Sequence, residues 1–433
     1  APMRYDIVDE TFGDWEDVTR LSEKYYLMFD YMLNHISAQS PYYKDFLKNK
    51  DNSPYKDLFI RYKDFWENGE PTEAEVDAIY KRKPRAPYVD AHFEDGTTEK
   101  VWCTFDEEQI DINCPSDTAK KFLVDNLTGM AKRGAAIIRL DAFAYAPKGV
   151  GEKNFLNEPA TWDVLTKVRE LADKYNLRLL PEIHASYEEK IYKKIADKGY
   201  MTYDFFLPGL IIDAFEQQSG EVLKRWADEL VEKKIQVVNM LGCHDGIPLL
   251  DLKGLISEER IQSVIDTVVK RGGYVKDLHG QKNVYYQVNA TYYSALGEDD
   301  KRMLFARAIQ VFMPGKPQVW YLDLFAGKND YEAVKRAGAG GHKEINRTNL
   351  TVKEMEDGLQ SDIVQKQLEI LRLRSTFHAF SKDSEFEMKC AGSKIFMEWK
   401  NNNSHAVLEG NLLSCEFNII AKENGDIVYK SDL

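Results

Sequence analysis

Three carboxylates stand at the ends of short apolar segments that have the composition of buried strands. Helical stretches separate these segments, which span residues 134–141, 177–182 and 235–245. A strand that alternates with helices is typical of βα units, and parallel strands bring their carboxyl ends to one face. We therefore expect Asp141, Glu182 and Asp245 to share one pocket. Acids grouped in this way can supply the nucleophile and the proton donor that cleave a glycosidic bond.

The residues beside each acid indicate how its charge is set. Arg139 stands two positions before Asp141 on the same strand, so both side chains face the same side and the cation favours the ionised carboxylate of a nucleophile. Glu182 is enclosed by Pro181 and an isoleucine, where burial would raise its pKa and let it carry a proton. Any one acid, taken singly, is better explained as a structural group or a helix cap. Three at successive strand ends favour catalysis.

Other polar side chains extend the candidate site. His35, His184 and His244 also fall at strand ends, where neutral imidazoles can hydrogen-bond sugar hydroxyls. A zinc site is the alternative, but no helical histidine pair with a third ligand is present in the sequence. The glycine-rich run at 337–342 lacks the Lys-Ser/Thr of a nucleotide loop, yet it could receive an anion through the basic residues at and after its end. A second basic cluster at 81–83 is either another anion site or a solvated loop.

These side chains need a fold that brings distant strand ends together, and the pattern of the chain predicts one. Strand-like runs end near residues 34, 141, 182, 207, 245 and 322. With 433 residues, the chain is long enough for a barrel of about 250 residues with smaller additions. We expect an α/β fold of the TIM (β/α)8 type, which places its chemistry at the carboxyl ends of the strands.

Breaks in periodicity predict how the chain is divided. Barrel parts are expected at 1–35, 114–245 and 299–385, irregular inserted subdomains at 36–113 and 246–298, and a small C-terminal β domain at 386–433. Six strands are two fewer than this barrel contains, and the sequence opens with Ala1 rather than methionine. We therefore expect the first two barrel strands to lie upstream and the shorter chain to be weakly active or inactive.

The composition excludes several classes of function. A net charge of −13 argues against a nucleic-acid surface. Five cysteines form an odd number without metal-ligand spacing, which indicates reduced thiols and a cytoplasmic protein. No apolar run reaches the length of about 18 residues that a membrane span needs. Aromatic residues make up 12% of the chain and serve equally well for stacking sugars or for filling a large core.

Four motifs in order resemble the signatures of glycoside hydrolase family 13, the α-amylase family. They are residues 30–35 (Asp-Tyr-Met-Leu-Asn-His), 139–143 (Arg-Leu-Asp-Ala-Phe), 182–184 (Glu-Ile-His) and 244–246 (His-Asp-Gly). Further segments resemble the sucrose phosphorylase group of that family, and the likeness runs over residues 1 to about 380. These segments are residues 12–15 (Phe-Gly-Asp-Trp), 287–293 (Gln-Val-Asn-Ala-Thr-Tyr-Tyr), 326–330 (Ala-Gly-Lys-Asn-Asp) and 344–347 (Glu-Ile-Asn-Arg).

The resemblance implies a retaining mechanism of two displacements without a metal or an organic cofactor. Asp141 would be the nucleophile, Glu182 the acid and base, and Asp245 the group that stabilises the transition state. The substrate would be bound by a further set: His35, Phe105, Arg139, His184, His244, Gln287 and Arg347. The implied products are α-D-glucose 1-phosphate and a fructosyl group, formed from a sucrose-type donor and inorganic phosphate by a monomer or homodimer that binds neither nucleic acid nor membrane. In the family Arg347 partners an aspartate that would lie before residue 1.

Three basic positions bear on the identity of the acceptor. Arg133, His342 and Lys343 resemble sucrose 6F-phosphate phosphorylases, which use such groups to hold the phosphate on fructose, and charge-assisted bonds to phosphate are a sound physical reason. We therefore favour sucrose 6F-phosphate, which would give fructose 6-phosphate, over plain sucrose. A hydrolase or transglucosylase on the same scaffold differs only in what attacks the glucosyl group. From another class, the chain could be an inactive, truncated carbohydrate-binding barrel.

Overall fold

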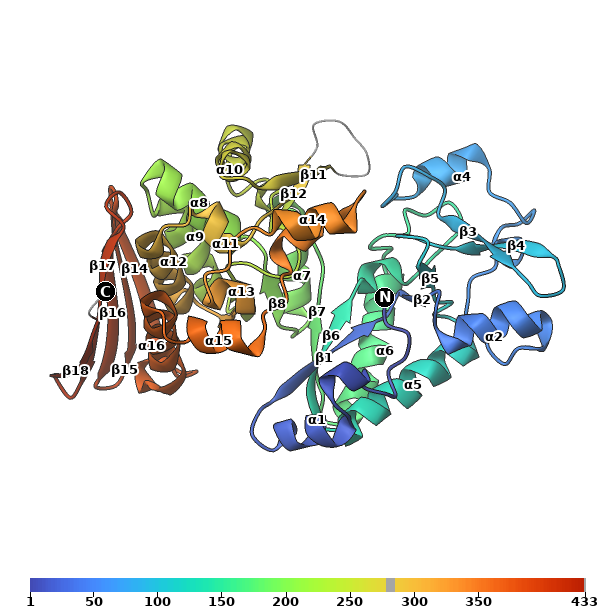
Figure 1. The fold of residues 1–433 in the computed structure, drawn as a ribbon, viewed down its shortest axis with the longest axis horizontal. Coiled ribbons are helices and arrows are strands. Elements are labelled where there is room, and N and C mark those ends of the chain that lie inside the picture. The colour runs from blue at the N-terminus through green and yellow to red at the C-terminus, as the bar shows by residue number, and fades with distance from the viewer. Residues whose placement is uncertain (278–284, 432–433) are drawn as a thin grey trace. The chain divides into compact units, whose positions relative to one another are not determined.

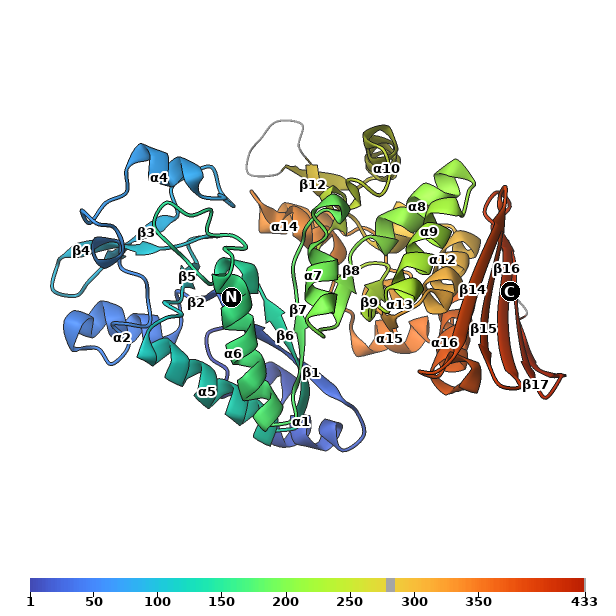
Figure 2. The same cartoon turned by 180° about the vertical axis from the view of Figure 1, so that it is seen from behind.

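The computed structural model describes residues 1–277 and 285–431, and it divides into two compact units, Ala1–Ile183 and His184–Leu433. Figures 1 and 2 show their elements from opposite sides. Each unit contains a parallel sheet of the kind predicted from the sequence. The finer division into six segments is not tested by this split and stays a prediction.

The first unit has a three-stranded parallel sheet at its centre. Its strands are β1 (Leu27–Met32), β6 (Ala135–Asp141) and β7 (Arg178–Pro181), in the order β1-β6-β7. The helices α5 (Asp117–Lys132) and α6 (Ala160–Lys174) precede β6 and β7 and lie beside the sheet in both ribbon views. Ser116 caps α5 by accepting from the amide of Ala119, which explains why this helix starts where it does. The predicted order of helix and acid-tipped strand is confirmed.

The segment between β1 and α5 is built from short elements. They are β2 (His35–Ser37), α2 (Pro41–Asn49), α3 (Tyr62–Phe65), α4 (Glu73–Ala78), β3 (Tyr88–His92), β4 (Thr98–Trp102) and β5 (Gln109–Asp111). The strands form two antiparallel pairs, β2 with β5 and β3 with β4. Tyr62, Trp66 and Trp102 pack into a small aromatic core of their own. The aromatic content noted in the sequence is therefore used here for packing.

The second unit contains another three-stranded parallel sheet. It consists of β8 (Thr202–Asp204), β9 (Val237–Met240) and β13 (Lys316–Gln318), in the order β13-β9-β8. Around it are α7 (Ile191–Asp197), α8 (Leu207–Gln217), α9 (Glu221–Glu232), α10 (Glu258–Lys270), α12 (Asp300–Phe312) and α16 (Asp362–Thr376). Every residue of α12 from Met303 to Phe312 is buried, so this helix is surrounded by the core. All six predicted strands are thus present among the described residues.

Three predicted strand ends were wrong. The strand expected to end at Asp245 stops at Met240, so Asp245 lies in the loop after β9. The strand expected to run to Pro208 stops at Asp204, because the carboxylate of Asp204 accepts from the amides of Phe206 and Leu207 and thereby starts α8. The strand expected to reach Leu322 stops at Gln318, and a short helix, α13 (Tyr321–Leu324), follows. At the ends of β8 and β13, local capping and turn formation ended the strand before the apolar run ended.

The C-terminal β domain predicted from residue 386 is confirmed as a five-stranded antiparallel meander. Its strands are β14 (Glu385–Ala391), β15 (Lys394–Asn401), β16 (Ser404–Asn411), β17 (Glu416–Glu423) and β18 (Asp426–Lys430), paired in chain order. Alternate residues of the central strands are buried, as in a sheet with one face on a core. Trp399 donates from Nε1 to the carbonyl of Phe312 at 2.7 Å, which attaches the sheet to the end of α12.

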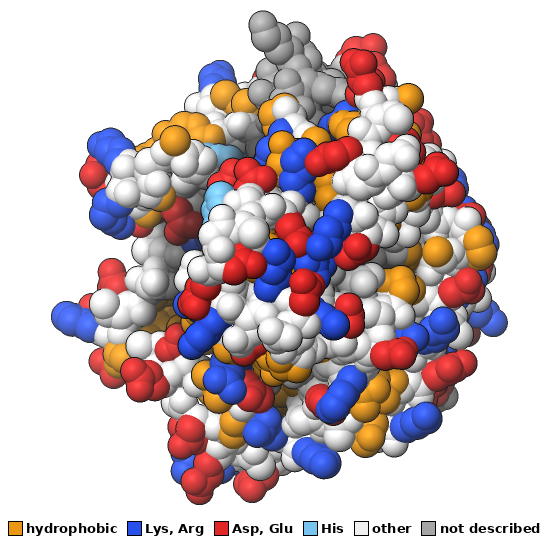
Figure 3. All heavy atoms as spheres, turned by 90° about the vertical axis from the view of Figure 1, so that its right-hand side faces the viewer, with side chains coloured by type: hydrophobic (Ala, Val, Ile, Leu, Met, Phe, Trp, Pro, Cys, Tyr) orange, Lys and Arg blue, Asp and Glu red, His pale blue; other side chains and the backbone are white. Residues whose placement is uncertain are grey.

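None of the helices in the described part of the chain is long and apolar enough to cross a membrane. On the face drawn in Figure 3, acidic and basic side chains are interspersed, without a broad region of one sign. The net negative charge is therefore distributed over this face rather than gathered into one patch.

Candidate active site

The carboxylates of Asp141 and Glu182 come from adjacent strand ends in the first unit. Asp141 is the last residue of β6, and Glu182 directly follows β7. The register pairs Leu140 with Pro181, and the amide of Glu182 donates to the carbonyl of Leu140 at 3.0 Å. Because Ile138 and Leu140 are fully buried on one face of β6, Arg139 and Asp141 project from the other face.

Arg139 connects these two acids. Its Nη1 donates to Asp141 Oδ1 at 2.9 Å and to Asp30 Oδ1 at 3.0 Å, while Nη2 lies 4.0 Å from Glu182 Oε1. The side chain of Arg139 is only 11% exposed, so these contacts are largely shielded from water. The pairing of β1 with β6, which sets Asp30 opposite Arg139, brings the third carboxylate within reach. The structure thus confirms that Asp141, Glu182 and Arg139 lie together.

The charge on the pair differs from what the sequence suggested. Burial and the neighbouring Glu182 raise the pKa of Asp141 well above its ordinary value, and Arg139 lowers it only in part. Two acids beside one cation in a buried site do not both ionise easily, so the pair retains a proton to higher pH than a solvated carboxyl would. Arg139 donates to Asp141 at 2.9 Å, whereas its approach to Glu182 is 4.0 Å. The retained proton therefore belongs to the adjacent pair of Asp141 and Glu182 as a whole.

Three rings form an aromatic wall in the same unit, consisting of His35, Phe105 and Tyr145. The ring of His35 lies edge-on to Phe105 with centroids 5.2 Å apart, and Phe105 lies edge-on to Tyr145 at 5.1 Å. Burial lowers the pKa of His35 to about 4, so this imidazole is neutral near pH 7. Glu182 is among the groups that raise the pKa of Tyr145, after burial. Through Tyr145 the wall is therefore electrostatically coupled to Glu182.

Tyr145 is a member of this group that sequence reasoning missed, and Arg82, noted only as part of the 81–83 basic cluster, is another member. Arg82 donates to the Tyr145 hydroxyl at 2.9 Å, and its guanidinium lies over the ring of Phe105 at 5.5 Å. The position of Tyr145, four residues after Asp141, was the available signal for it. Of the two interpretations left open for the 81–83 cluster, the solvated loop is wrong for Arg82.

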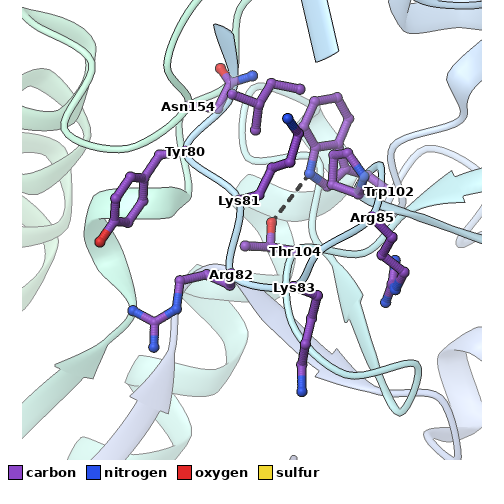
Figure 4. A pocket seen from close by; sticks show the side chains of 10 residues that line it. Tyr80, Lys81, Arg82, Lys83, Arg85, Trp102, Thr104 and Asn154 are labelled. Atoms are coloured by element: carbon purple, nitrogen blue, oxygen red, sulfur yellow. Dashed lines mark hydrogen bonds between the residues drawn. The ribbon is translucent and has the colours of Figure 1, made fainter. Parts of the chain in front are cut away.

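The segment around Arg82 also lines a small cavity, shown in Figure 4 with Trp102 donating to Thr104 at 3.2 Å. The cavity volume is about 10 Å³, which is room for about one water molecule. This cavity is therefore not a sugar subsite. In Figure 4 the side chain of Lys83 extends away from the Trp102–Thr104 pair.

Asp245 is the centre of a cationic cluster in the second unit. Lys343 Nζ donates to Asp245 Oδ1 at 2.6 Å, Arg347 Nη2 lies 3.4 Å from the same oxygen, and His244 Nε2 lies 3.5 Å from Oδ2. The 3-10 helix η6 (Gly341–Asn346) supplies Lys343, and Arg347 follows it. Asn346 Nδ2 donates to the carbonyl of Asp245 at 2.8 Å, which fixes the loop against η6. The predicted residues His244, Asp245, Lys343 and Arg347 are thus brought together.

This cluster determines the charge of Asp245. Burial disfavours its ionised form, but Lys343 and His244 outweigh burial and hold the pKa of Asp245 well below its usual range. Asp245 is therefore an anion at any physiological pH. Arg347 was expected to pair with an aspartate before residue 1; its guanidinium lies near Asp245 and, at 3.8 Å, Glu344.

Other predicted residues of the second unit lie near Asp245. His184 stacks on Phe205 with centroids 3.9 Å apart, and its Nδ1 lies 3.2 Å from the buried carboxylate of Asp251. His184 also contributes to lowering the pKa of Asp245. Gln287, in β12 (Tyr285–Asn289), is buried, and a Cβ added to Gly246 would meet its Cδ at 3.0 Å. His342 belongs to η6, like Lys343.

Arg133 is not brought to the acids. It caps the C-terminus of α5, where its guanidinium lies over Trp15 at 4.4 Å. Since Arg133 precedes β6 and Asp141 ends it, the seven-residue strand separates them by about 20 Å. The prediction that Arg133 binds the acceptor phosphate is therefore wrong on geometric grounds. That Asp141, Glu182 and Asp245 share one pocket stays a prediction, since Asp245 belongs to the other unit.

Comparison with known proteins identifies the family of the chain. Residues 3–268 match the family model "Alpha amylase, catalytic domain". The chain is 45% identical to the sucrose 6(F)-phosphate phosphorylase of Ilumatobacter coccineus, over 95% of this chain and 84% of that protein. It is 39% identical to the sucrose phosphorylase of Streptococcus mutans, over 95% of this chain and 85% of that one.

Solved structures give the same result for the fold. The crystal structure of sucrose 6F-phosphate phosphorylase from Thermoanaerobacter thermosaccharolyticum matches with a TM-score of 0.93 and 36% identity, covering 100% of this chain and 87% of that one. The α-amylase of H. orenii matches with a TM-score of 0.61 at 14% identity, which supports the fold alone. The predicted TIM-type barrel with a small C-terminal antiparallel domain is confirmed. The chain belongs to glycoside hydrolase family 13, the α-amylase family, and to its sucrose phosphorylase group.

Proposed function

We propose that this chain is a retaining glucoside phosphorylase that transfers the glucosyl group of sucrose 6F-phosphate to inorganic phosphate. The products are α-D-glucose 1-phosphate and fructose 6-phosphate. The observation that carries the proposal is the pair of acids beside Arg139, which retains a proton to higher pH than a solvated carboxyl would and so allows one acid to be ionised while the other is protonated. A retaining glycosyl transfer needs one group of each kind.

In the first displacement, Asp141 attacks the anomeric carbon and the bond from that carbon to the fructosyl oxygen breaks. Glu182 gives its proton to the departing oxygen, so that the fructosyl group leaves neutral at that atom. A covalent glucosyl–Asp141 ester remains, and Glu182 is now an anion. The two carboxyl groups are expected to be about 5–5.5 Å apart, as retention requires.

In the second displacement, phosphate takes the place that water takes in a hydrolase. Glu182 removes a proton from the attacking phosphate, the ester to Asp141 breaks, and glucose 1-phosphate forms with its original α configuration. The resting protonation of both acids is restored. Asp245, held anionic by Lys343, His244 and His184, is suited to stabilise the positive charge that develops on the sugar ring.

The remaining predicted residues would position the donor. The neutral imidazole of His35 and the ring of Phe105 present a hydrogen-bonding atom and an apolar edge. In the second unit, His184, Gln287 and Arg347 accompany Asp245. The anchoring of His184 by Asp251 fixes its ring orientation, which is a property expected of a group that binds one hydroxyl.

The identity of the donor, and hence of the leaving fructosyl group, is the finer part of the proposal. The relatives of Ilumatobacter coccineus and Thermoanaerobacterium thermosaccharolyticum, at 45% and 36% identity, are sucrose 6(F)-phosphate phosphorylases. His342 remains a candidate for the fructosyl phosphate, whereas Lys343 is engaged by Asp245. Sucrose itself is the second candidate. The Streptococcus mutans relative is a sucrose phosphorylase, and Arg133, which lies over Trp15, gives no support for recognition of a fructosyl phosphate.

The test is release of glucose 1-phosphate from sucrose 6F-phosphate and from sucrose, each with and without inorganic phosphate. We expect phosphate-dependent release with preference for the phosphorylated donor, and none from Asp141→Ala. Preference for sucrose would support the second candidate. Free glucose produced equally well without phosphate would identify a hydrolase and overturn the proposed function, and a folded wild-type protein without turnover would favour a carbohydrate-binding role.

We also propose that the protein works in the cytoplasm, as a monomer or homodimer. Support comes from its cysteines: Cys103, Cys114, Cys243, Cys390 and Cys415 are all free thiols. The proposed substrates, a phosphorylated sugar and inorganic phosphate, also fit a cytoplasmic enzyme. Labelling of all five thiols in protein purified without reductant tests the compartment.

A further inference from the structure

A buried ion pair contacts the segments that carry the aromatic wall of the first unit. The side chains of Lys148 and Asp111 are 3% and 0% exposed, and Lys148 Nζ lies 2.8 Å from Asp111 Oδ2. Removing two charges from water costs several kcal/mol per ion before their attraction offsets it, so such a pair is weak evidence for stability. Its contacts point to a different role.

The ammonium group of Lys148 is surrounded by oxygen atoms from three segments. Besides Asp111, it contacts Asn34 Oδ1 at 2.8 Å and the carbonyl of Tyr145 at 2.7 Å. An ammonium group has three donors, so these three oxygens match its capacity. Asp111 in turn accepts from the amide of Thr104 at 2.9 Å and from its hydroxyl at 2.5 Å. The pair is therefore fully hydrogen-bonded to groups on fixed backbone.

Each of these contacts lies within one residue of the aromatic wall. Asn34 precedes His35, Thr104 precedes Phe105, and Tyr145 is itself a wall residue. The ladder of β2 and β5 sets His35 opposite Asp111. The ion pair thus joins the three chain segments that carry the three rings, although these segments are far apart in the sequence.

The same pair also closes the turn that follows Asp141. Ala142, the next residue, has φ 53°, a left-handed conformation that is unfavourable for alanine and needs support from its surroundings. The turn η3 (Phe143–Tyr145) follows, and Lys148 donates back to the carbonyl of Tyr145. The ion pair therefore connects the aromatic wall to the backbone that carries Asp141.

We propose that Lys148 and Asp111 are positioning residues for glucosyl transfer, which hold the aromatic wall and the turn after Asp141 in one fixed arrangement. Neither residue contacts the reacting atoms in this role. This inference rests on the proposed function. It adds that the ammonium group of Lys148 sets the geometry of the donor site. Loss of the cation loosens three segments at once.

The variant Lys148→Met removes the charge and retains the length of the side chain. We expect a folded protein whose kcat/KM falls about 100-fold, the effect of misplacing reacting groups by about 1 Å. The matched control is Lys120→Met on α5, whose lysine is 58% exposed and paired with Asp117; its kcat/KM should not change. Wild-type kcat/KM in folded Lys148→Met would overturn the inference.

Because Lys148→Met leaves Asp111 without its cation, a second variant is needed if it does not fold. Lys148→Met combined with Asp111→Asn removes both buried charges, and this protein should fold, yet remain slow. A double variant with wild-type kcat/KM would show that the pair is dispensable for positioning. In addition, ethylammonium ions should restore turnover to Lys148→Ala, whereas ethanol should not.

Hydrogen–deuterium exchange gives a readout that does not depend on activity. In the double variant we expect faster exchange confined to residues 33–37, 103–111 and 142–148. Unchanged exchange there would overturn the positioning role. If wild-type protein shows no phosphorolysis, the proposed function fails, and the exchange experiment still decides whether the ion pair positions these segments.

Discussion

Replacing Arg139 by glutamine should move the acidic limb of the pH–rate profile to higher pH. Asp141 must be ionised to act as a nucleophile, so activity falls as the pH drops through its pKa. Burial and Glu182 raise this pKa, and Arg139, which donates to Asp141 Oδ1 at 2.9 Å, opposes them. Removing the guanidinium therefore raises the pKa further, and ionisation of Asp141 then requires a higher pH.

The size of this movement follows from the geometry. Two unit charges about 4 Å apart attract by about 4 kcal/mol at an effective dielectric constant of about 20, and a tenfold change in an ionisation constant corresponds to about 1.36 kcal/mol. Dividing the first energy by the second gives about three pH units, which is the upper limit for this pair. The shift is smaller than this limit because the side chain of Asp141 is 24% exposed, so that water partly replaces the lost cation. We expect the limb to move by about 1–3 pH units, the range for an aspartate beside an arginine.

The assay is kcat/KM for glucose 1-phosphate release, measured between about pH 4.5 and 9 for wild-type protein and Arg139→Gln. At a fixed pH below the limb, moving the limb up by one pH unit makes the ionised fraction of Asp141 tenfold smaller. Arg20→Gln is the matched control, since this arginine is 66% exposed and pairs with Asp17 on α1 (Trp15–Ser22). An Arg139→Gln profile that is lower but has an unmoved acidic limb would refute the electrostatic reasoning.

Three further outcomes are expected. Lys343→Met should raise the pKa of Asp245 and lower kcat/KM about tenfold. The control is Lys335→Met, because Lys335 is an exposed lysine of α14 (Tyr331–Ala337), and this change should alter neither quantity. Equal kcat/KM in the two variants would contradict the role assigned to Lys343. Trp399→Phe should lower the free energy of unfolding by about 1 kcal/mol through loss of the bond to Phe312, with kcat unchanged in the folded fraction, as urea unfolding and steady-state kinetics would show. Burial raises the pKa of Asp204 from 3.8 to about 6, so its contribution to stability is largest below about pH 4 and falls by about 3 kcal/mol as the pH rises through 6. Asp204→Asn should flatten that pH dependence. Urea titrations at pH 4.5 and 7 measure the free energy of unfolding, and an equal change between the two pH values in wild-type protein and Asp204→Asn would count against the prediction.

Much of the fold was predictable because the alternation of strands and helices is local. The helices at 117–132, 160–174, 300–312 and 362–376 and the acid-tipped strands follow from apolar periodicity and from capping residues such as Ser116. The ends of β8 and β13 were wrong, since apolar residues continue past both strands while the backbone has already turned into a helix. Periodicity identifies an apolar run but does not say which element buries it.

The candidate site was predictable to a similar degree. The position of Asp141 two residues after Arg139 determines that both project from one face of a strand, and the motif order indicates which acids belong to one chemistry. Arg133 shows the limit of that reasoning. It is close to Asp141 in sequence, but an extended strand separates its ends by its full length, so Arg133 lies over Trp15 instead.

By itself, therefore, the amino-acid sequence determined the family, the order of acids and the strand face that Arg139 and Asp141 share, because these depend on spacing along the chain. Only the tertiary structure decided the charges and partners: that Glu182 and burial raise the pKa of Asp141, that Lys343 binds Asp245, and that Lys148 sits among Asn34, Asp111 and Tyr145. Electrostatic energies depend on distance in space and on the exclusion of water, and neither quantity is encoded in the spacing of residues along the chain.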